Sequence, residues 1–334
     1  MNVLITGGAG FIGSHVVENL LEDKKIKKIS VIDNLKDGSL KNLKPCLRNN
    51  KFFFYKRDIN NINSIKYLFK KIDVVIHLAA LSDIVPSITD PIHYLNTNIM
   101  GTVNVLEAMR IYSVPKIIYA ASSSCYGIPK KYPTSESSKI ELKYPYAFSK
   151  YTGEQVILHW SKVYGINFVS LRLFNVYGLR SRTHGAYGAA LGVFLKQKIS
   201  KKPFTVVGTG NQKRDFVNAK DVAVAFKKAV FLKKNNLILN IGSSNPKSVN
   251  YLLGLIKGKK IYIPKRPGEP HMTFANIKMA KKKLKWQPLI SLSVGINEVL
   301  ENINYWKNAP LWNSNKIYKA TKIWFKYLSK SKNN

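Results

Sequence analysis

Short apolar runs recur along the first half of the chain and alternate with longer segments of helical periodicity. Runs of four or five such residues are typical of strands that are buried on both faces, and the helical segments between them are typical of crossover connections. The pattern predicts an α/β fold with a doubly wound parallel sheet. Its six expected strands are residues 3–6, 29–32, 52–55, 74–78, 117–120 and 168–171.

A glycine-rich turn follows the first expected strand and begins a helix. Gly8, Gly10 and Gly13 have the spacing of the dinucleotide fingerprint, in which glycines allow a tight turn and a close approach of the backbone to a pyrophosphate. Asp33 ends the second strand, where a carboxylate accepts hydrogen bonds from ribose hydroxyls and repels a 2′-phosphate. The turn therefore predicts a Rossmann-type domain that binds NAD in preference to NADP.

Polar and small residues follow the later strands at the edge where ligands bind. Ligands of doubly wound sheets lie outside the carboxyl ends of the strands. Asp58 follows the third strand, Ala79 and Ala80 follow the fourth, and Asn175 follows the sixth. Three serines, at residues 122–124, follow the fifth strand. We expect these residues to lie around one site.

Tyr146 and Lys150 stand one helical turn apart, which places a phenol and an ammonium on the same helix face. Bringing a tyrosine pKa from ~10 to ~7 takes about 4 kcal/mol. One charge ~4 Å away supplies roughly that much at an effective dielectric of ~20. The pair can thus form a base for a hydroxyl proton. The chain has 18 tyrosines and 54 Lys plus Arg, so this spacing also arises by chance.

Composition indicates a globular protein. Of 334 residues, 45% are hydrophobic, and no run approaches the ~18 apolar residues of a membrane span. The first strand begins directly after Met1-Asn2, which favours a cytoplasmic protein without a signal peptide. Cys46 and Cys125 are far apart and lack a Cys-x-x-Cys pattern, so we expect neither a disulfide framework nor a metal site.

The formal net charge of +36 raises the alternative of a nucleic-acid-binding protein. The lysines are scattered among abundant Asn and Ile over the whole chain, as expected from a compositional bias. We therefore expect no specific nucleic-acid partner. A basic protein still attracts anionic ligands such as nucleotide diphosphates.

Ten motifs together resemble the extended short-chain dehydrogenase/reductase (NAD-dependent epimerase/dehydratase) family, and within it the UDP-glucose and UDP-N-acetylglucosamine 4-epimerases. The resemblance covers about 300 residues and ends near Pro310. Its motifs are residues 6–15, 77–80, 98–102, 122–127, 146–150, 172–178, 208–210, 214–217, 221–223 and 266–269.

The resemblance implies roles for the catalytic and cofactor-binding residues. Tyr146 is the expected base on the sugar 4-hydroxyl, and Lys150 lowers its pKa and holds the nicotinamide ribose. A serine among Ser122, Ser123 and Ser124 hydrogen-bonds the same hydroxyl; the family spacing favours Ser122, and serines of such a turn can also serve only backbone groups. Expected NAD contacts are Gly7, Gly10, Phe11, Ile12, Gly13, Asp33, Asn34, Asp58, Ile59, Leu78, Ala79, Ala80, Asn98, Tyr146 and Lys150.

The resemblance also implies a nucleotide-sugar site with two arginines. The planar guanidinium group of an arginine can bind two phosphate oxygens at once. Thr273 stands where some relatives have a bulky tyrosine, which leaves room for an N-acetylhexosamine as well as glucose and galactose. An isolated threonine can equally be structural. The expected substrate contacts are Ser124, Tyr146, Asn175, Arg214, Arg266 and Thr273.

The serine-rich loop separates the reactions of the family. Its 4,6-dehydratases carry an Asp-Glu pair where this chain has Ser123 and Ser124, and serine does no acid–base work near neutral pH. We therefore predict an NAD-dependent nucleotide-sugar 4-epimerase that oxidises C4 transiently and returns hydride to the opposite face. A 4,6-dehydratase, a 4-ketosugar reductase and a non-catalytic NAD-binding protein remain alternatives.

The family fold implies two domains and a tail. We expect an NAD-binding domain from residues 1–174 and 213–242, a nucleotide-sugar-binding domain from residues 175–212 and 243–310, and a basic tail at 311–334. The helices after strands four and five commonly form a homodimer in relatives.

The tail has the pattern of a basic amphipathic helix. It either packs on its own domain or makes weak contact with an anionic membrane surface. Its apolar face comprises Ile317, Ala320, Trp324 and Leu328, and its basic face comprises Lys319, Lys322, Lys326 and Lys330.

Overall fold

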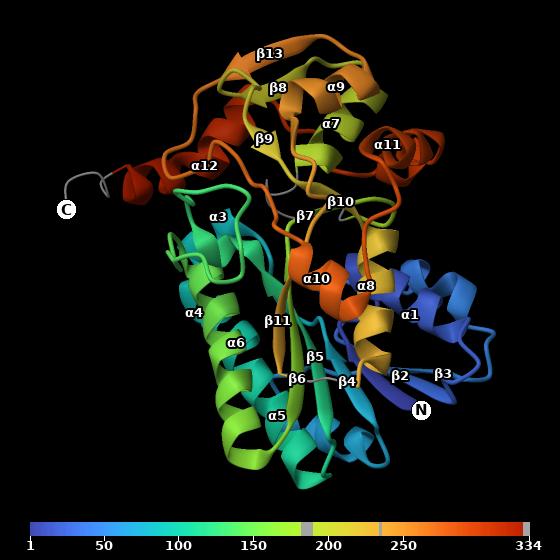
Figure 1. The fold of residues 1–334 in the computed structure, drawn as a ribbon. Helices are drawn as coiled ribbons and strands as arrows, with labels where there is room; N and C mark the ends of the chain where they lie inside the picture. Colours follow the sequence, from blue (N-terminus) through green and yellow to red (C-terminus); the bar gives the residue numbers. More distant parts are fainter. Residues whose placement is uncertain (182–189, 234–235, 330–334) are drawn as a thin grey trace.

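The computed structural model describes residues 1–181, 190–233 and 236–329. A large part built on a central sheet carries a smaller part along one edge, and the C-terminal helix lies at the boundary between them (Figure 1). Lys330, which the sequence analysis placed on the basic face of that helix, lies outside the described residues.

Seven parallel strands form the central sheet in the order β11-β6-β5-β4-β1-β2-β3. The predicted fold class is confirmed, and all six predicted strands are present. The seventh strand arrives from the second half of the chain and pairs with β6. The strands are β1 (Asn2–Thr6), β2 (Lys28–Asp33), β3 (Phe52–Lys56), β4 (Val74–His77), β5 (Lys116–Ser122), β6 (Asn167–Leu173) and β11 (Leu237–Ile241).

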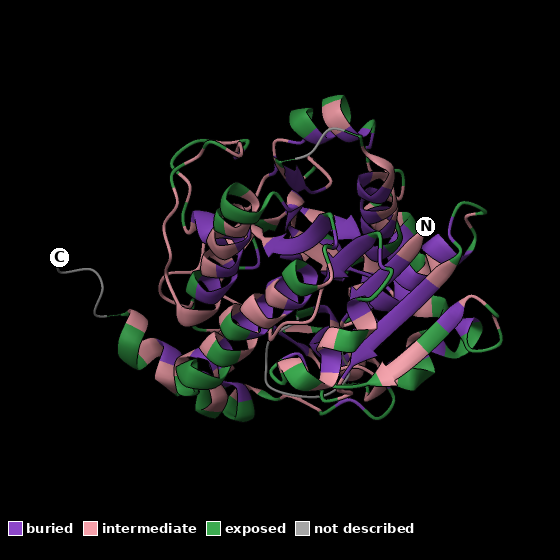
Figure 2. Cartoon of the chain, turned by 90° about the horizontal axis from the view of Figure 1, so that it is seen from below, coloured by how far each residue is buried: buried purple, intermediate pink, exposed green. Residues whose placement is uncertain are grey.

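Both faces of the sheet are buried because successive side chains of each strand enter different cores. Ile5 joins the core beneath α1 and α8, whereas its neighbour Leu4 joins the core beneath α5 and α6. Seen from below, the central strands are buried, whereas the edge strand β3 and the outer helix faces are partly exposed (Figure 2). The covering helices are α1 (Phe11–Leu21), α8 (Ala219–Phe231), α5 (Gly101–Ile111) and α6 (Pro145–Tyr164).

The smaller part has a separate hydrophobic core that includes Leu195, Phe204, Leu252 and Trp306. Its helices are α7 (Ala190–Ile199), α9 (Val249–Ile256) and α11 (Leu292–Glu301). Three strand pairs accompany them: β8 (Phe204–Val207) with β13 (Lys260–Ile263), β9 (Lys213–Arg214) with β12 (Lys247–Ser248), and β7 (Asn175–Tyr177) with β10 (Phe216–Asn218).

One segment departs from the domain division expected from the sequence. Residues 275–286, which include α10 (Lys278–Leu284), were expected in the nucleotide-sugar-binding domain. Ala280 and Trp286 pack instead in the core that the large sheet shares with α1 and α8. The Trp286 indole also donates a hydrogen bond to the Asp221 carbonyl of α8 at 2.8 Å. We propose that the chain returns to the large domain over this segment.

The C-terminal tail forms the helix α12 (Ser314–Leu328) and packs on its own chain. It buries Ile317, Thr321 and Trp324, and it lies along α3 (Ile84–Thr89) of the large part. The expected apolar face is thus rotated slightly, with Thr321 in place of Ala320. Among the described helices, none is long and apolar enough to cross a membrane.

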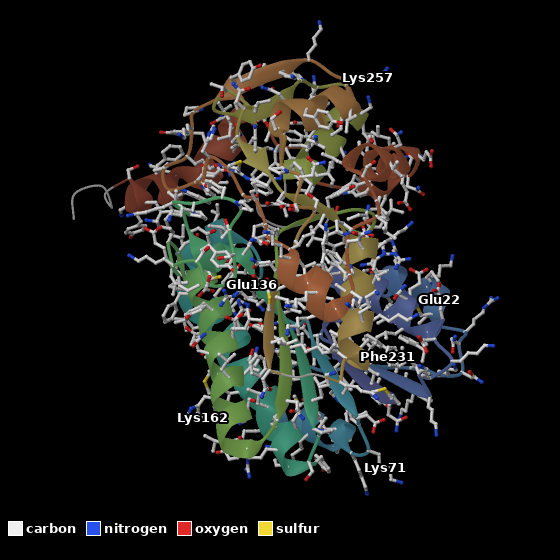
Figure 3. All side chains as sticks on the ribbon, viewed as in Figure 1. Glu22, Lys71, Glu136, Lys162, Phe231 and Lys257 are labelled. Atoms are coloured by element: carbon white, nitrogen blue, oxygen red, sulfur yellow. The ribbon has the colours of Figure 1, made fainter. Side chains whose placement is uncertain are left out.

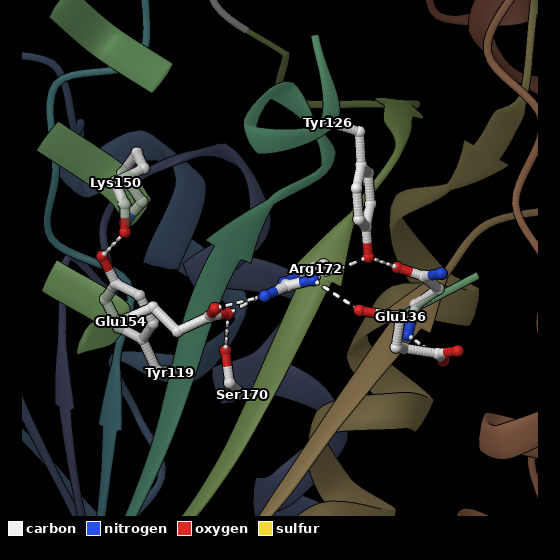
Figure 4. A network of polar contacts seen from close by, with 8 residues as sticks. Tyr119, Tyr126, Glu136, Lys150, Glu154, Ser170 and Arg172 are labelled. Carbon is white, nitrogen blue, oxygen red and sulfur yellow. Dashed lines mark hydrogen bonds and ion pairs between the residues drawn. The ribbon is translucent and has the colours of Figure 1, made fainter. Parts of the chain in front are cut away.

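A buried ion pair connects α6 to the sheet. Arg172 on β6 and Glu154 on α6 lie 2.6 Å apart, with side chains that are 4% and 1% exposed. On its other side the guanidinium donates a hydrogen bond to the Tyr126 hydroxyl at 2.9 Å, which donates to Asn240 of β11 at 2.7 Å (Figure 4). The network joins α6, the loop after β5 and two strands.

Removal of one partner would leave the other charge buried and unpaired. Glu154→Ala should therefore lower the free energy of unfolding by about 3–5 kcal/mol, measured by urea denaturation. Arg110→Ala is the matched control, because this exposed arginine pairs with Glu107 at the surface. Equal destabilisation by both variants would contradict a structural role for the buried pair.

Candidate active site

A cavity of about 1170 Å³ lies at the carboxyl ends of the strands and continues into the smaller part. Side chains from the large part and from the smaller part meet where the two parts join (Figure 3). The volume of the cavity exceeds the ~300–1,000 Å³ of an ordinary ligand pocket, as expected of a site for two ligands. Every catalytic, cofactor and substrate residue predicted from the sequence lines it, except Asn98.

The glycine turn leaves the N-terminus of α1 open to the cavity. Gly7 has a φ of 72°, in the left-handed region that favours glycine. A Cβ on Gly13 would lie 2.2 Å from the Gly7 carbonyl oxygen, so no other residue fits there. Gly10 caps the helix without a side chain. Backbone N–H groups and the helix dipole at this end fit a pyrophosphate.

Asp33 lies beneath the glycine turn at the end of β2. Its carboxylate accepts hydrogen bonds from the Ala9 amide at 3.0 Å and the Leu35 amide at 2.8 Å. Burial raises the pKa of Asp33, and these two hydrogen bonds oppose that effect. Next to it, the Asn34 amide donates to Asp58 at 2.9 Å. Two carboxylates at this end of the cavity suit ribose hydroxyls and disfavour a 2′-phosphate, so the residues fit NAD.

Asn98 does not line the cavity, because its side chain is buried and engaged in holding the loop after β4. The amide accepts a hydrogen bond from the Leu81 backbone at 2.8 Å and donates to the Leu81 carbonyl at 3.0 Å. It also donates to the Ser149 hydroxyl of α6 at 2.8 Å. We propose that Asn98 is a positioning residue for the nearby loop that lines the NAD site.

Ser122 and Tyr146 meet at the centre of the cavity, where β5 ends and α6 begins. The Ser122 hydroxyl hydrogen-bonds the Tyr146 phenol and accepts from the Ser124 amide at 3.2 Å. Ser123 and Ser124 line the same wall, and the Ser124 hydroxyl is buried with no hydrogen-bond partner among the described residues. The geometry favours Ser122 as the serine that shares the substrate hydroxyl with Tyr146.

Lys150 is not among the groups that shift the pKa of Tyr146 in this structure, so its expected effect on the phenol stays a prediction. Burial raises the pKa of Tyr146 above its ordinary value, and the hydrogen bond from Ser122 only partly offsets this. Lys150 lies over the ring of Tyr119, with its nitrogen 4.2 Å from the ring centroid. Burial also lowers the pKa of Lys150 to about 7, against the opposing effect of Glu154. Helical spacing fixed the helix face but not the direction of the lysine side chain.

The expected substrate end of the cavity is built from segments far apart in the sequence. Thr273 donates a hydrogen bond to the Asn175 side chain at 2.7 Å and accepts one from the Asp215 amide at 2.9 Å. Thr273 therefore orients Asn175 as well as lining the cavity. Arg214 forms an ion pair with Glu269 at 2.6 Å, which keeps its guanidinium at the cavity wall.

Tyr144 and Trp324 are among the aromatic residues of the cavity that were absent from the sequence-based site. The Tyr144 ring is parallel to that of Tyr146, with centroids 6.5 Å apart, and Trp324 of α12 lies beside Tyr144. Tyr144 precedes Pro145 at the start of α6, so its proximity to Tyr146 was the available signal. No sequence signal placed Trp324 at the cavity, because α12 lies beyond the resemblance.

Cys46 and Cys125 are buried and unpaired, and burial raises the pKa of the Cys125 thiol to about 12. Across the described ranges, no group of three His, Cys, Asp or Glu side chains is arranged to hold a metal ion.

Residues 3–242 match the model of the NAD dependent epimerase/dehydratase family. UDP-glucose 4-epimerase of Mycolicibacterium smegmatis is 32% identical over 90% of this chain and 98% of its own. UDP-glucuronic acid 4-epimerase of Bacillus cereus, solved with UDP-glucuronic acid and NAD, is 32% identical with a TM-score of 0.85 over 91% of this chain and 99% of its own. UDP-N-acetylglucosamine 4-epimerase of Methanobrevibacter ruminantium, solved with UDP-N-acetylmuramic acid, is 28% identical. It matches with a TM-score of 0.83 over 90% of this chain and 98% of its own.

The glycine turn provides a test of the cofactor site. Gly13→Ala should purify without NAD, because its Cβ would displace the Gly7 carbonyl. Gly254→Ala in α9 is the control, since a Cβ there meets no atom within 4 Å. NAD released by denaturation is quantified by chromatography. Normal NAD content in Gly13→Ala would rule out this turn as the pyrophosphate site.

The low pKa of Lys150 predicts a pH-dependent stability. Between pH 7 and 10.5 the unfolded chain binds a proton that the folded protein releases, so the Lys150 contribution to stability rises with pH. Below pH 7 its buried charge is fully destabilising. Lys150→Met should thus raise the free energy of unfolding by roughly 3–5 kcal/mol at pH 7, and the gain should vanish towards pH 10.5.

Denaturation curves at several pH values would measure this difference. Lys162→Met is the control, because Lys162 is exposed on the same helix. A gain that stays constant from pH 7 to 10.5 would show that the Lys150 pKa is not lowered.

Proposed function

The chain belongs to the NAD-dependent epimerase/dehydratase family, and from this we propose that it is an NAD-dependent nucleotide-sugar 4-epimerase that acts on UDP-linked hexoses. The observation that carries the proposal is the meeting of Ser122, Tyr146 and Lys150 in one cavity with the glycine turn on one side and two arginines on the other.

Different residues of the cavity have different roles in the reaction. Bound NAD supplies an acceptor and then a donor of hydride, and a positively charged nicotinamide that favours the Tyr146 phenolate. Tyr146 takes the proton of the C4 hydroxyl as the C4–H bond breaks, and gives a proton back when hydride returns to the other face. Ser122 holds the same oxygen in both steps. Substrate and product are isomers, so no net oxidation occurs.

Arg214 and Arg266 provide cationic groups for the diphosphate at the other end of the cavity. A diphosphate fixed there lets the 4-ketose turn without leaving. Ser123 and Ser124 occupy the loop where an elimination of water would need an acid and a base, so the residues favour epimerisation over dehydration.

We propose that the enzyme accepts UDP-glucose and UDP-galactose and also the corresponding N-acetylhexosamines. The small side chain of Thr273 lines the cavity beside Asn175 and supports this range. The Methanobrevibacter relative, named for UDP-N-acetylglucosamine, is consistent with it.

We further propose a cytoplasmic homodimer. Exposed apolar side chains lie on the helices that follow β4 and β5: Ile92 is 70% exposed, Ile111 50%, Phe148 45% and Val163 53%. Pairing of two copies through these helices would cover them.

The protein should convert UDP-glucose and UDP-N-acetylglucosamine to their 4-epimers without added cofactor, as resolved by chromatography. UDP-glucuronic acid serves as the comparison sugar. Tyr146→Phe should lower kcat by about 10²–10⁴-fold while NAD content stays normal. Tyr164→Phe is the control, because Tyr164 is exposed on the same helix.

Absence of a 4-epimer from all three sugars, even with NAD added, would refute the proposed reaction. Turnover of UDP-glucose without UDP-N-acetylglucosamine would refute only the wider sugar range.

A further inference from the structure

The C-terminal helix α12 places a tryptophan in the wall of the active-site cavity. Trp324 is 3% exposed, lines the cavity, and lies within a segment beyond the motifs shared with the family. The solved relatives are matched over 98% and 99% of their own length and over 90% and 91% of this chain.

Trp324 contacts Arg266, one of the two arginines that are expected to bind the diphosphate. The Arg266 guanidinium carbon lies 5.6 Å from the centroid of the Trp324 ring, in the range of a cation–π contact. The indole N–H donates to the carbonyl of Pro267, the next residue, at 2.7 Å. One side chain thus fixes both the guanidinium and the backbone of the segment that carries it.

The same ring also faces the catalytic end. Tyr144 lies 6.1 Å from Trp324 between ring centroids and 6.5 Å from Tyr146. The three rings form a continuous row from the expected diphosphate site to the expected base.

The helix that carries Trp324 is anchored at two other places. Ile317 packs with Val193 and Ile263 of the smaller part, and α12 lies along α3 of the large part. At its start, the Asn313 side chain accepts a hydrogen bond from the Lys316 amide. Trp324 is therefore held in place by contacts on both sides of the cavity.

We propose that α12 is part of the substrate site and that Trp324 is a positioning residue, which orders Arg266 for the diphosphate of the nucleotide sugar. The inference rests on the proposed function, because it assumes a diphosphate ligand at Arg266. Ordering a flexible arginine before binding strengthens binding without a new ligand contact.

Variants of Trp324 test this role in the full-length protein. Trp324→Leu should raise the Kd for UDP, measured by calorimetry, and the KM for UDP-glucose by about tenfold, with little change in kcat. Trp324→Phe should recover most of the loss, because it keeps a ring for Arg266. Lys322→Ala, on the exposed face of α12, should bind UDP like the wild type.

A double-mutant cycle separates positioning from packing. If Trp324 acts through Arg266, Trp324→Leu should weaken UDP binding little further in an Arg266→Ala background. Full additivity would overturn the proposal. Loss of bound NAD together with UDP binding in Trp324→Leu would also overturn it, since it would assign Trp324 to stability alone.

The proposed function and this inference fail in different ways. A wild-type protein that neither binds UDP nor converts any of the UDP-sugars would refute both. A wild type that does both, with Trp324→Leu unchanged in Kd and KM, would refute only the role of Trp324.

Discussion

The active site depends on how α6 is held against the sheet, and the buried pair of Glu154 and Arg172 fixes that helix. Tyr146, Lys150 and Glu154 follow one another at intervals of one turn, so they share a helix face. Arg172 holds the last of the three with a bidentate contact, through hydrogen bonds of 2.6 and 3.1 Å to the two carboxylate oxygens. Ser170 donates a third, at 2.7 Å. Because a helix rotates as a unit, the fixed carboxylate sets the direction of the phenol two turns earlier.

Close packing supports the same constraint. A Cβ on Gly153 would lie 2.6 Å from the Tyr119 hydroxyl, so this glycine lets α6 approach β5. Tyr119 in turn donates a hydrogen bond to the Lys150 carbonyl and presents its ring to the Lys150 ammonium. The burial that makes this contact possible also lowers the pKa of Lys150 and raises that of Tyr146. Burial thus disfavours the charged forms of both side chains.

The sequence predicted those features that local pattern determines. Strands, the glycine turn and Asp33 follow from periodicity and spacing, and they lie where expected. Features that depend on tertiary contacts were not accessible: the Asn98 amide holds a loop 17 residues earlier, and Lys150 turns towards a ring on a neighbouring strand. Likewise, Trp286 packs in the core of the large sheet because Asp221 on α8 accepts its N–H, and nothing near residue 286 in the sequence indicates this partner.

An epimerase of this kind has two opposed requirements, since the nucleotide must stay fixed while the sugar turns within the pocket. The cavity is arranged to meet both. Arg214 is held by Glu269, and Arg266 lies against Trp324, so the protein's own side chains order the two arginines that are expected to bind the diphosphate. At the expected sugar end, the side chain of Thr273 is small and donates a hydrogen bond to Asn175. Because α12 contacts both parts of the molecule, it connects the segment that carries Arg266 to the large part, where Tyr146 lies.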